Sequence, residues 1–213
     1  MRSPSEVFFL PGALGRTEFW HPVANLLTHP ARKVHVSWPG FNGVPADASI
    51  RSIGDLVRKF LGQVREPSAI VAQSMGGVVA LLAALQRPEM FTHLVLTATS
   101  GGINLGDFGA EDWRPAMRSM HPELPDWFTS YGEDLTPKLS SLRMPTLLLW
   151  GDDDAISPVI AGRRLASLFP NAELHVFPGG GHDLGRTFAK SIAPLVDRHL
   201  SKTSYSTDVK TST

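Results

Sequence analysis

Short apolar runs alternate with longer helix-forming stretches over the first hundred residues. Four runs are rich in β-prone residues and short enough to be buried strands; they span 7–10, 33–38, 69–73 and 93–99. The stretches between them have helical spacing or helix-forming composition and cover 17–27, 49–63 and 78–85. The run at 33–38 alternates apolar and polar residues, which is typical of a strand nearer the edge of a sheet. Strands that alternate with helices predict a parallel, doubly wound α/β sheet.

This alternation is interrupted between residues 101 and 143. The segment gathers aromatic and methionine side chains, and its four prolines permit only short helices. We interpret it as a small helical lid inserted between two strands. Strands are again expected at 146–150 and 173–177, and helices at 157–169 and 184–200. The expected core is therefore 1–100 and 144–200, with about six strands, followed by a disordered tail at 201–213.

The amino-acid composition excludes several kinds of functional site and disfavours several kinds of binding partner. The chain has 213 residues, 42% of them hydrophobic, enough for one globular domain with a sizeable core. Lys plus Arg number 20, as do Asp plus Glu, so the charge balance does not favour nucleic acid or an anionic membrane as partner. The absence of cysteine excludes disulfides, thiolate metal sites and a cysteine nucleophile. We find neither a signal peptide nor a membrane-spanning apolar segment, and expect a soluble cytoplasmic protein.

A serine stands at the corner where the third predicted strand turns into a helix. The sequence there is IVAQSMGGVVAL, with Ser74 at the turn. So sharp a turn needs small residues two before and two after it, and Ala72 and Gly76 meet that need. The turn would expose the serine hydroxyl and aim the Met75 amide at nearby negative charge. This pattern is typical of a nucleophile elbow, although a serine can also serve there simply as a helix N-cap.

Two later loops supply the groups that an activated serine requires. His182 lies in a glycine-rich loop after the last predicted strand, where its imidazole could act as the base. Asp154, or a neighbouring aspartate, follows the strand before it and could orient that imidazole. We interpret Asp152 and Asp153 as exposed loop charges or helix caps. The seven other histidines are expected at surface or packing positions; they are His21, His29, His35, His93, His121, His175 and His199.

The order nucleophile, acid, base resembles that of the α/β-hydrolase superfamily. The resemblance covers about residues 7–200 and rests on four motifs, LPGALG at 10–15, AQSMG at 72–76, WGDDD at 150–154 with Pro158, and Gly181 with His182. Two features depart from the family pattern. Pro11 replaces a histidine that often precedes the oxyanion-loop glycine, and the chain begins at what would be the family's third strand. The resemblance therefore implies a trimmed sheet of about six strands that lacks the first two.

The resemblance also implies roles for individual residues. Its Gly-x-x-Asp pattern selects Asp154 as the acid. The oxyanion donors would be the amides of Ala13 and Met75, with Leu14 as the alternative to Ala13. Together these groups imply two-step acyl transfer, in which Ser74 attacks an ester and water releases the acid. No cofactor is implied, since the glycine-rich loops match neither a P-loop nor a dinucleotide fingerprint, and no residues have metal-ligand spacing.

The apolar lid composition predicts a small to medium, largely apolar substrate. Leu14, Trp113 and Met117 are the candidate contacts, although lid residues such as Trp113 and Met117 could simply attach the lid to the sheet. Arg114 and Arg118 could grip a carboxylate, but a solvated helix face is the favoured interpretation. The same triad in similar folds supports carbon–carbon bond hydrolysis, elimination of the menaquinone-pathway type, perhydrolysis or, in a different class, a small-ligand receptor. The motifs do not separate these functions, and they leave the oligomeric state open.

Overall fold

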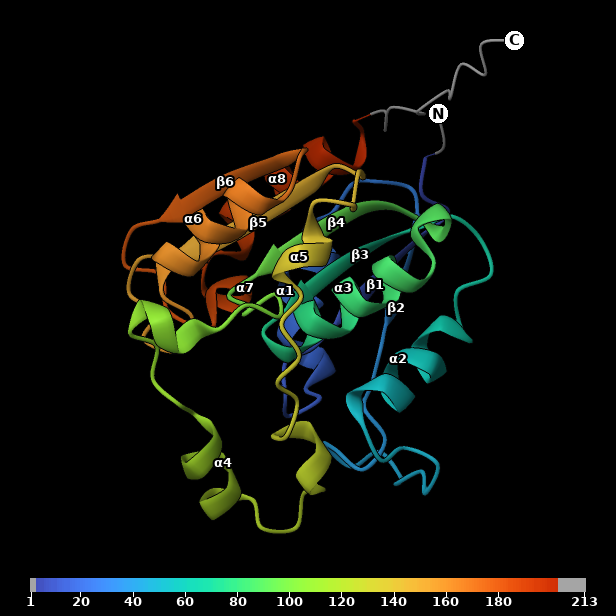
Figure 1. Ribbon diagram of the computed structural model, residues 1–213. Helices are drawn as coiled ribbons and strands as arrows, with labels where there is room; N and C mark the ends of the chain where they lie inside the picture. The colour runs from blue at the N-terminus through green and yellow to red at the C-terminus, as the bar shows by residue number, and fades with distance from the viewer. Residues whose placement is uncertain (1–2, 203–213) are drawn as a thin grey trace, which may run out of the picture.

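Six strands form one parallel sheet in the computed structural model, which describes residues 3–202 (Figure 1). The strands are β1 (Glu6–Leu10), β2 (Arg32–His35), β3 (Ser68–Gln73), β4 (Phe91–Thr97), β5 (Thr146–Gly151) and β6 (Ala172–Phe177). Their order is β2-β1-β3-β4-β5-β6, and each neighbouring pair is parallel. The predicted fold class is confirmed, and the strand at 33–38 does lie at an edge. The predicted tail falls almost wholly outside the described residues.

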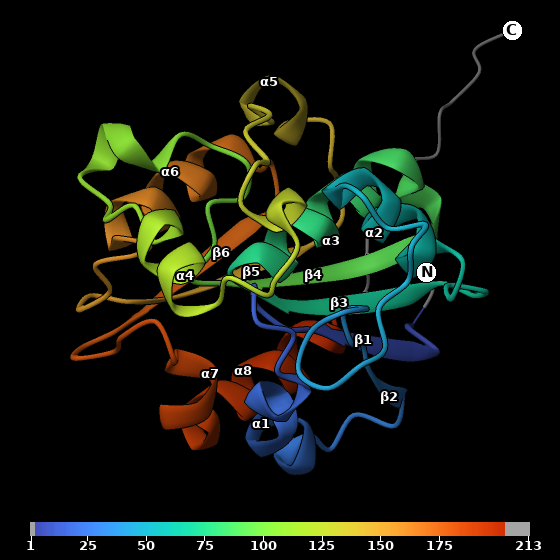
Figure 2. The same ribbon diagram turned by 90° about the horizontal axis from the view of Figure 1, so that it is seen from below.

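Helices cover both faces of the sheet, as Figure 2 shows. One face carries α2 (Ile53–Leu61), α3 (Met75–Gln86) and α6 (Val159–Leu168), and the other carries α1 (His21–Leu26), α7 (Leu184–Thr187) and α8 (Ala189–Leu200). Alternate residues of β1 serve the two layers: Phe8 and Leu10 join the core on the α2–α3–α6 side, and Val7 and Phe9 join the other. None of the helices formed by residues 3–202 has both the length and the apolar character that a bilayer crossing needs.

Several element boundaries differ from the predicted ones. The helix predicted at 17–27 begins as a 3₁₀ turn, η1 (Thr17–Trp20), with no side-chain cap, and Leu26 near its end is 45% exposed. α2 begins at Ile53 rather than near residue 49 because Ser52 caps it, its Oγ accepting a hydrogen bond from the Asp55 amide at 3.1 Å. The helix predicted at 184–200 is two helices separated by Phe188.

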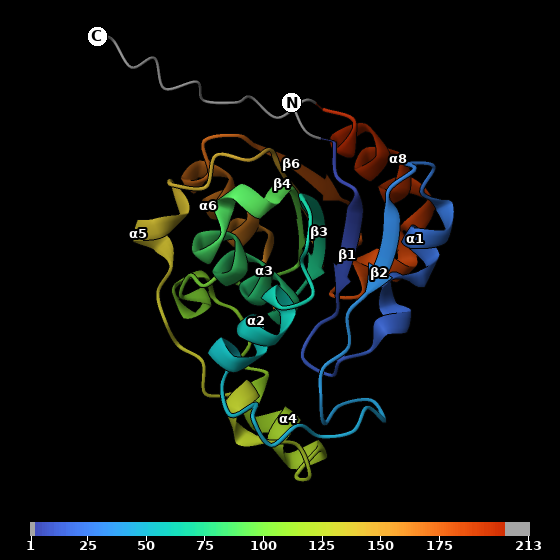
Figure 3. The same ribbon diagram turned by 90° about the vertical axis from the view of Figure 1, so that its right-hand side faces the viewer.

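The segment between β4 and β5 forms four short helices, of which α4 lies beyond the carboxyl ends of the strands and α5 lies outside the α3–α6 layer (Figures 1 and 3). They are η3 (Leu105–Phe108), α4 (Arg114–Met120), η4 (Asp126–Phe128) and α5 (Thr136–Leu139); a further 3₁₀ turn, η2 (Pro88–Met90), precedes β4. Prolines occupy the first turns of α4 and α5, where no intrahelical N–H bond is needed. Phe41, in the loop after β2, packs edge-on against Trp127 and Phe128, with ring centroids 5.7 and 5.4 Å away. The segment is thereby attached to the core.

Two of the histidines expected at packing positions form a buried pair beneath the sheet. His93 on β4 and His199 on α8 have exposed fractions of 0% and 2%, and their rings lie 5.2 Å apart. His93 Nε2 lies 2.8 Å from the carbonyl oxygen of Lys202. Burial, followed by the nearby charges of His93 and Lys202, lowers the pKa of His199 to about 3. Burial likewise lowers the pKa of His93. Both imidazoles therefore stay neutral in the folded protein at pH values where free histidine is charged.

The folded state is expected to lose stability as the pH falls below about 6.5. Below that pH the unfolded chain takes up a proton at residue 199, whereas the folded chain does so only near pH 3. Between pH 6.5 and 5.0 this difference amounts to about 1.6 kcal/mol of unfolding free energy. Urea unfolding of the wild type and His199→Leu across this range measures it. The variant should show the shallower dependence on pH, and parallel curves would contradict the assignment.

Candidate functional site

Ser74 occupies a strained turn between β3 and α3. Its backbone angles, φ 52° and ψ −122°, are uncommon for a residue with a side chain. The turn brings α3 against β1 so closely that a Cβ on Gly76 would lie 2.4 Å from the Pro11 carbonyl oxygen. Glycine at 76 therefore lets the helix approach the first loop, and Ala72 is fully buried on the other side of the corner. The local geometry is the one that the sequence predicted.

The loops after β3, β5 and β6 bring three predicted side chains together. His182 Nε2 lies 3.1 Å from Ser74 Oγ, and His182 Nδ1 lies 2.9 Å from Asp154 Oδ2 and 3.2 Å from Oδ1. The loops that carry the acid and the base touch directly. The Asp153 amide donates to the Gly180 carbonyl at 3.0 Å, and a Cβ on Gly151 would lie 1.9 Å from that same oxygen. Because residue 151 is glycine, the two loops can approach closely enough for the His182 imidazole to contact the Asp154 carboxylate.

Asp154 differs from its two neighbours in burial and in hydrogen bonding. Its side chain has an exposed fraction of 0%, and its Oδ1 accepts bonds from the amides of Ile156 and Ser157, each at 2.9 Å. Asp152 and Asp153 are exposed, and Asp152 accepts a bond from the Gly179 amide at 2.7 Å. Because only Asp154 is both buried and directed at His182, the geometry agrees with the choice that the Gly-x-x-Asp pattern makes.

The first loop, 11–15, lies beside Ser74 and is held by the chain around it. Trp38 Nε1 donates to the Gly12 carbonyl at 2.9 Å, and the Gly15 amide donates to the same oxygen at 3.1 Å. Within residues 3–202, the amides of Ala13 and Met75 donate to no other residue. Free amides at a loop beside the hydroxyl and at a helix N-terminus are suited to receive negative charge.

Gln73, which the sequence interpretation did not include, connects the strand to the base loop. Its side-chain amide donates to the His182 carbonyl at 3.3 Å, and it packs so closely against Gly12 that a Cβ there would lie 2.3 Å from Gln73 Oε1. The sequence feature that could have indicated this role is its position, directly before Ser74 at the end of a buried strand. Gln73 therefore contacts both loops that flank the serine.

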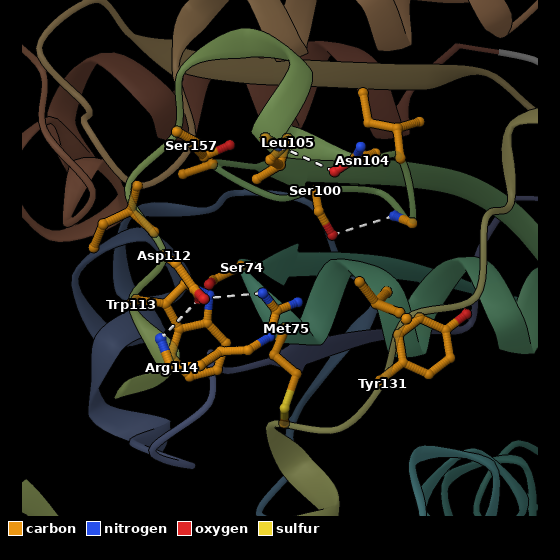
Figure 4. Close-up of a pocket in the computed structure, with 18 of the residues that line it drawn as sticks. Ser74, Met75, Ser100, Asn104, Leu105, Asp112, Trp113, Arg114, Tyr131 and Ser157 are labelled. Atoms are coloured by element: carbon orange, nitrogen blue, oxygen red, sulfur yellow. Dashed lines mark hydrogen bonds and ion pairs between the residues drawn. The ribbon is translucent and has the colours of Figure 1, made fainter. Parts of the chain in front are cut away.

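Two cavities meet at Ser74 and His182, which line both of them together with Trp113 and Ile156. The larger, of about 430 Å³, extends under the segment between β4 and β5 (Figure 4), and the smaller, of about 290 Å³, lies along the first loop. Leu14 and Met117 line the smaller cavity, so the three predicted contacts all face the site. The sequence interpretation missed most of the apolar wall of the larger cavity, which includes Ile53, Val78, Ile103, Leu105 and Phe128.

The two arginines of α4 have different surroundings. Arg114 lines the larger cavity, bonds to Asp112 at 3.2 Å and lies 5.7 Å from the centre of the Trp113 ring (Figure 4). Arg118 instead donates to the Thr129 hydroxyl at 2.7 Å. The two arginines therefore do not act together to hold a substrate carboxylate. Among the described residues, no group of three or more histidine, aspartate or glutamate side chains is arranged to hold a metal ion.

Comparisons with known proteins agree with the fold. Residues 7–190 match the family model described as "Alpha/beta hydrolase family". A 2-hydroxy-6-oxo-6-phenylhexa-2,4-dienoate hydrolase of Burkholderia cepacia is 43% identical, the match covering 81% of this chain and 78% of that protein. A 2-hydroxy-6-oxononadienedioate/2-hydroxy-6-oxononatrienedioate hydrolase of a Pseudomonas species is 27% identical over the same shares. The solved esterase RhEst1 of Rhodococcus sp. ECU1013 has a TM-score of 0.76 at 18% identity, covering 94% of this chain and 91% of that one.

Proposed function

The chain belongs to the alpha/beta hydrolase family, and on that premise we propose that it is a serine hydrolase of small to medium, largely apolar carboxylic esters. One observation carries the proposal: Asp154, His182 and Ser74 form a continuous hydrogen-bonded series, with contacts of 2.9 and 3.1 Å, at the point where both cavities meet. A serine with a hydrogen-bonded imidazole and a buried carboxylate is the arrangement that acyl transfer uses.

In the proposed mechanism each group carries out one step. His182 takes the proton of Ser74 as the hydroxyl oxygen attacks the ester carbonyl, and Asp154 holds the imidazole with its proton on Nδ1. The amides of Ala13 and Met75 stabilise the developing oxyanion, at about 3 kcal/mol per donor in comparable enzymes. His182 then protonates the leaving alcohol, and a water molecule, deprotonated by His182, releases the acid and frees Ser74.

The apolar part of the wall of the larger cavity supports the proposed substrate class. The wall formed by Ile53, Val78, Ile103 and Phe128 suits an apolar acyl or alcohol group, and about 430 Å³ limits its size. The segment 101–143 would act as a lid, because residues from it, including Trp113 and Tyr131, cover this cavity (Figure 4). No cofactor and no nucleic-acid partner enters this proposal.

Carbon–carbon bond hydrolysis is the second candidate. It is supported by the two relatives named above, whose names describe hydrolases of 2-hydroxy-6-oxo-dienoates and related acids. Such a substrate is a ketone, and water cleaves the bond beside its carbonyl carbon rather than an ester bond. The same triad and oxyanion donors could serve either carbonyl, so the choice depends on how the cavities hold the rest of the molecule.

Turnover of two substrate sets decides between the candidates. We would compare kcat/KM for p-nitrophenyl esters from acetate to octanoate with that for 2-hydroxy-6-oxo-6-phenylhexa-2,4-dienoate, following nitrophenolate and benzoate release. Multiple turnovers with a higher kcat/KM for an ester support the ester hydrolase. A higher value for the dienoate supports carbon–carbon hydrolysis. Turnover of neither set would contradict both proposals and favour the elimination, perhydrolysis or receptor functions.

A further inference from the structure

A threonine outside the triad is bonded to the nucleophile turn. Thr99 lies just after β4, the strand next to β3, and is fully buried. Its hydroxyl donates to the Ser74 carbonyl at 2.6 Å and accepts a bond from the Gly101 amide at 3.1 Å. A Cβ on Gly77 would lie 2.4 Å from Thr99 Oγ1, so the first turn of α3 has glycine where the threonine approaches. Thr99 therefore contacts the strained turn from the side opposite the first loop.

The same residue is also bonded to the loop that carries the acid. Ser157 Oγ donates to the Thr99 carbonyl at 3.2 Å, and the Ser157 amide donates to Asp154 Oδ1 at 2.9 Å. Ser157 is 1% exposed, and its own carbonyl accepts a bond from Trp150 Nε1 at 3.0 Å. A continuous series of hydrogen bonds thus runs from the backbone of Ser74 through Thr99 and Ser157 to the carboxylate of Asp154.

We propose that Thr99 and Ser157 are positioning residues, which hold the nucleophile turn and the acid loop where Ser74 and Asp154 can both contact His182. The inference rests on the proposed serine-hydrolase function. Ser74 has a backbone conformation that costs free energy, so it persists only where surrounding bonds hold it. Its carbonyl accepts two bonds, from the Gly77 amide at 2.9 Å and from Thr99. Loss of the second lets the turn relax and moves Ser74 Oγ relative to the imidazole.

Thr99→Val tests this role because valine keeps the shape and removes the hydroxyl. We expect kcat to fall by about tenfold to a hundredfold with KM unchanged, since a shift of about 1 Å at reacting groups can cost about a hundredfold. Thr99→Ser retains the hydroxyl and should restore most of the rate. Thr97→Val is the matched control: Thr97 is equally buried on β4, and its Oγ1 has no hydrogen-bond partner among the described residues. That variant should keep the wild-type kcat.

A fluorophosphonate probe separates this inference from the proposed function. Ser74 Oγ attacks the phosphorus, fluoride leaves and His182 takes the proton, so the labelling rate reports the reactivity of Ser74 without a true substrate. Wild-type protein that is not labelled at Ser74 would overturn the proposed function. Wild-type protein labelled at the same rate as Thr99→Val would overturn the positioning role while leaving the function intact. Equal losses in Thr99→Val and Thr99→Ser would also overturn it, because the hydroxyl would not be responsible.

The link to the acid loop has its own test, the double variant Thr99→Val with Ser157→Ala. If both residues act through one series of bonds, the double variant should label at about the rate of the slower single variant. Rate losses that multiply would show that the two residues act separately, which would overturn the link. Thermal unfolding of each variant checks that the folded fraction is the same in every rate measurement.

Discussion

Ser74→Ala is expected to reduce kcat by about 10⁶-fold. The serine oxygen forms the covalent bond in the proposed mechanism, so alanine leaves no nucleophile at the strained turn. His182 and Asp154 contact each other through the Nδ1 atom and remain in place, but they have no hydroxyl to deprotonate. Residual turnover would come from the oxyanion donors and from binding alone. Steady-state hydrolysis of the preferred ester measures the loss.

The control for this variant is a serine far from the site. Ser167 lies exposed on α6, where its hydroxyl donates to the Arg164 carbonyl at 2.7 Å, so Ser167→Ala should retain the wild-type kcat. Both variants should unfold at nearly the wild-type temperature, because neither side chain fills the core. Activity in Ser74→Ala within tenfold of wild type would contradict the assignment of Ser74 as the nucleophile.

Asp154→Asn is expected to lower kcat by about 10⁴-fold without unfolding the protein. The asparagine oxygen can still accept the bonds from the Ile156 and Ser157 amides that Oδ1 now receives. Its NH₂ group would then occupy the place of Oδ2, 2.9 Å from His182 Nδ1, and would donate to that nitrogen. The imidazole proton would move to Nε2, which faces Ser74 and could no longer accept the serine proton. Measurement of kcat together with the unfolding temperature tests this expectation.

Asp152→Asn is the matched control within the same three-aspartate sequence. Asp152 is exposed and accepts a bond from the Gly179 amide, and asparagine can accept the same bond. We expect kcat within about twofold of wild type, because no charge beside His182 changes. If Asp152→Asn lost as much activity as Asp154→Asn, the acid would have been assigned to the wrong residue.

Local sequence was sufficient for the elements whose determinants lie within a few residues. The buried strand before Ser74, the small residues at 72 and 76 and the helix after them all lie in one short stretch, so the turn could be predicted from it. The alternation of strands and helices likewise predicted a parallel sheet, which the six-stranded order confirms. The Ser52 cap of α2 was also readable in the sequence, and attention to it would have placed the helix start correctly.

Contacts between distant elements required the tertiary structure. The wall of the larger cavity takes Ile53 from α2, Val78 from α3 and Phe128 from the inserted segment, and in sequence each is indistinguishable from an ordinary core residue. The burial of His199 against His93 and the bonds from Thr99 to Ser74 and from Ser157 to Thr99 also join separate elements. Nothing in the pattern around each residue specifies its partner.

The sequence by itself determined the fold class, the sharp turn at Ser74 and the chain order of the candidate acid and base, because backbone preference and hydrophobic period are local properties. Tertiary structure alone decided which aspartate is buried, how the loops after β5 and β6 approach through Gly151 and Gly180, and which side chains enclose the cavities. Those outcomes depend on how packed elements meet across the sheet, and that geometry arises only when the whole chain excludes water from its core.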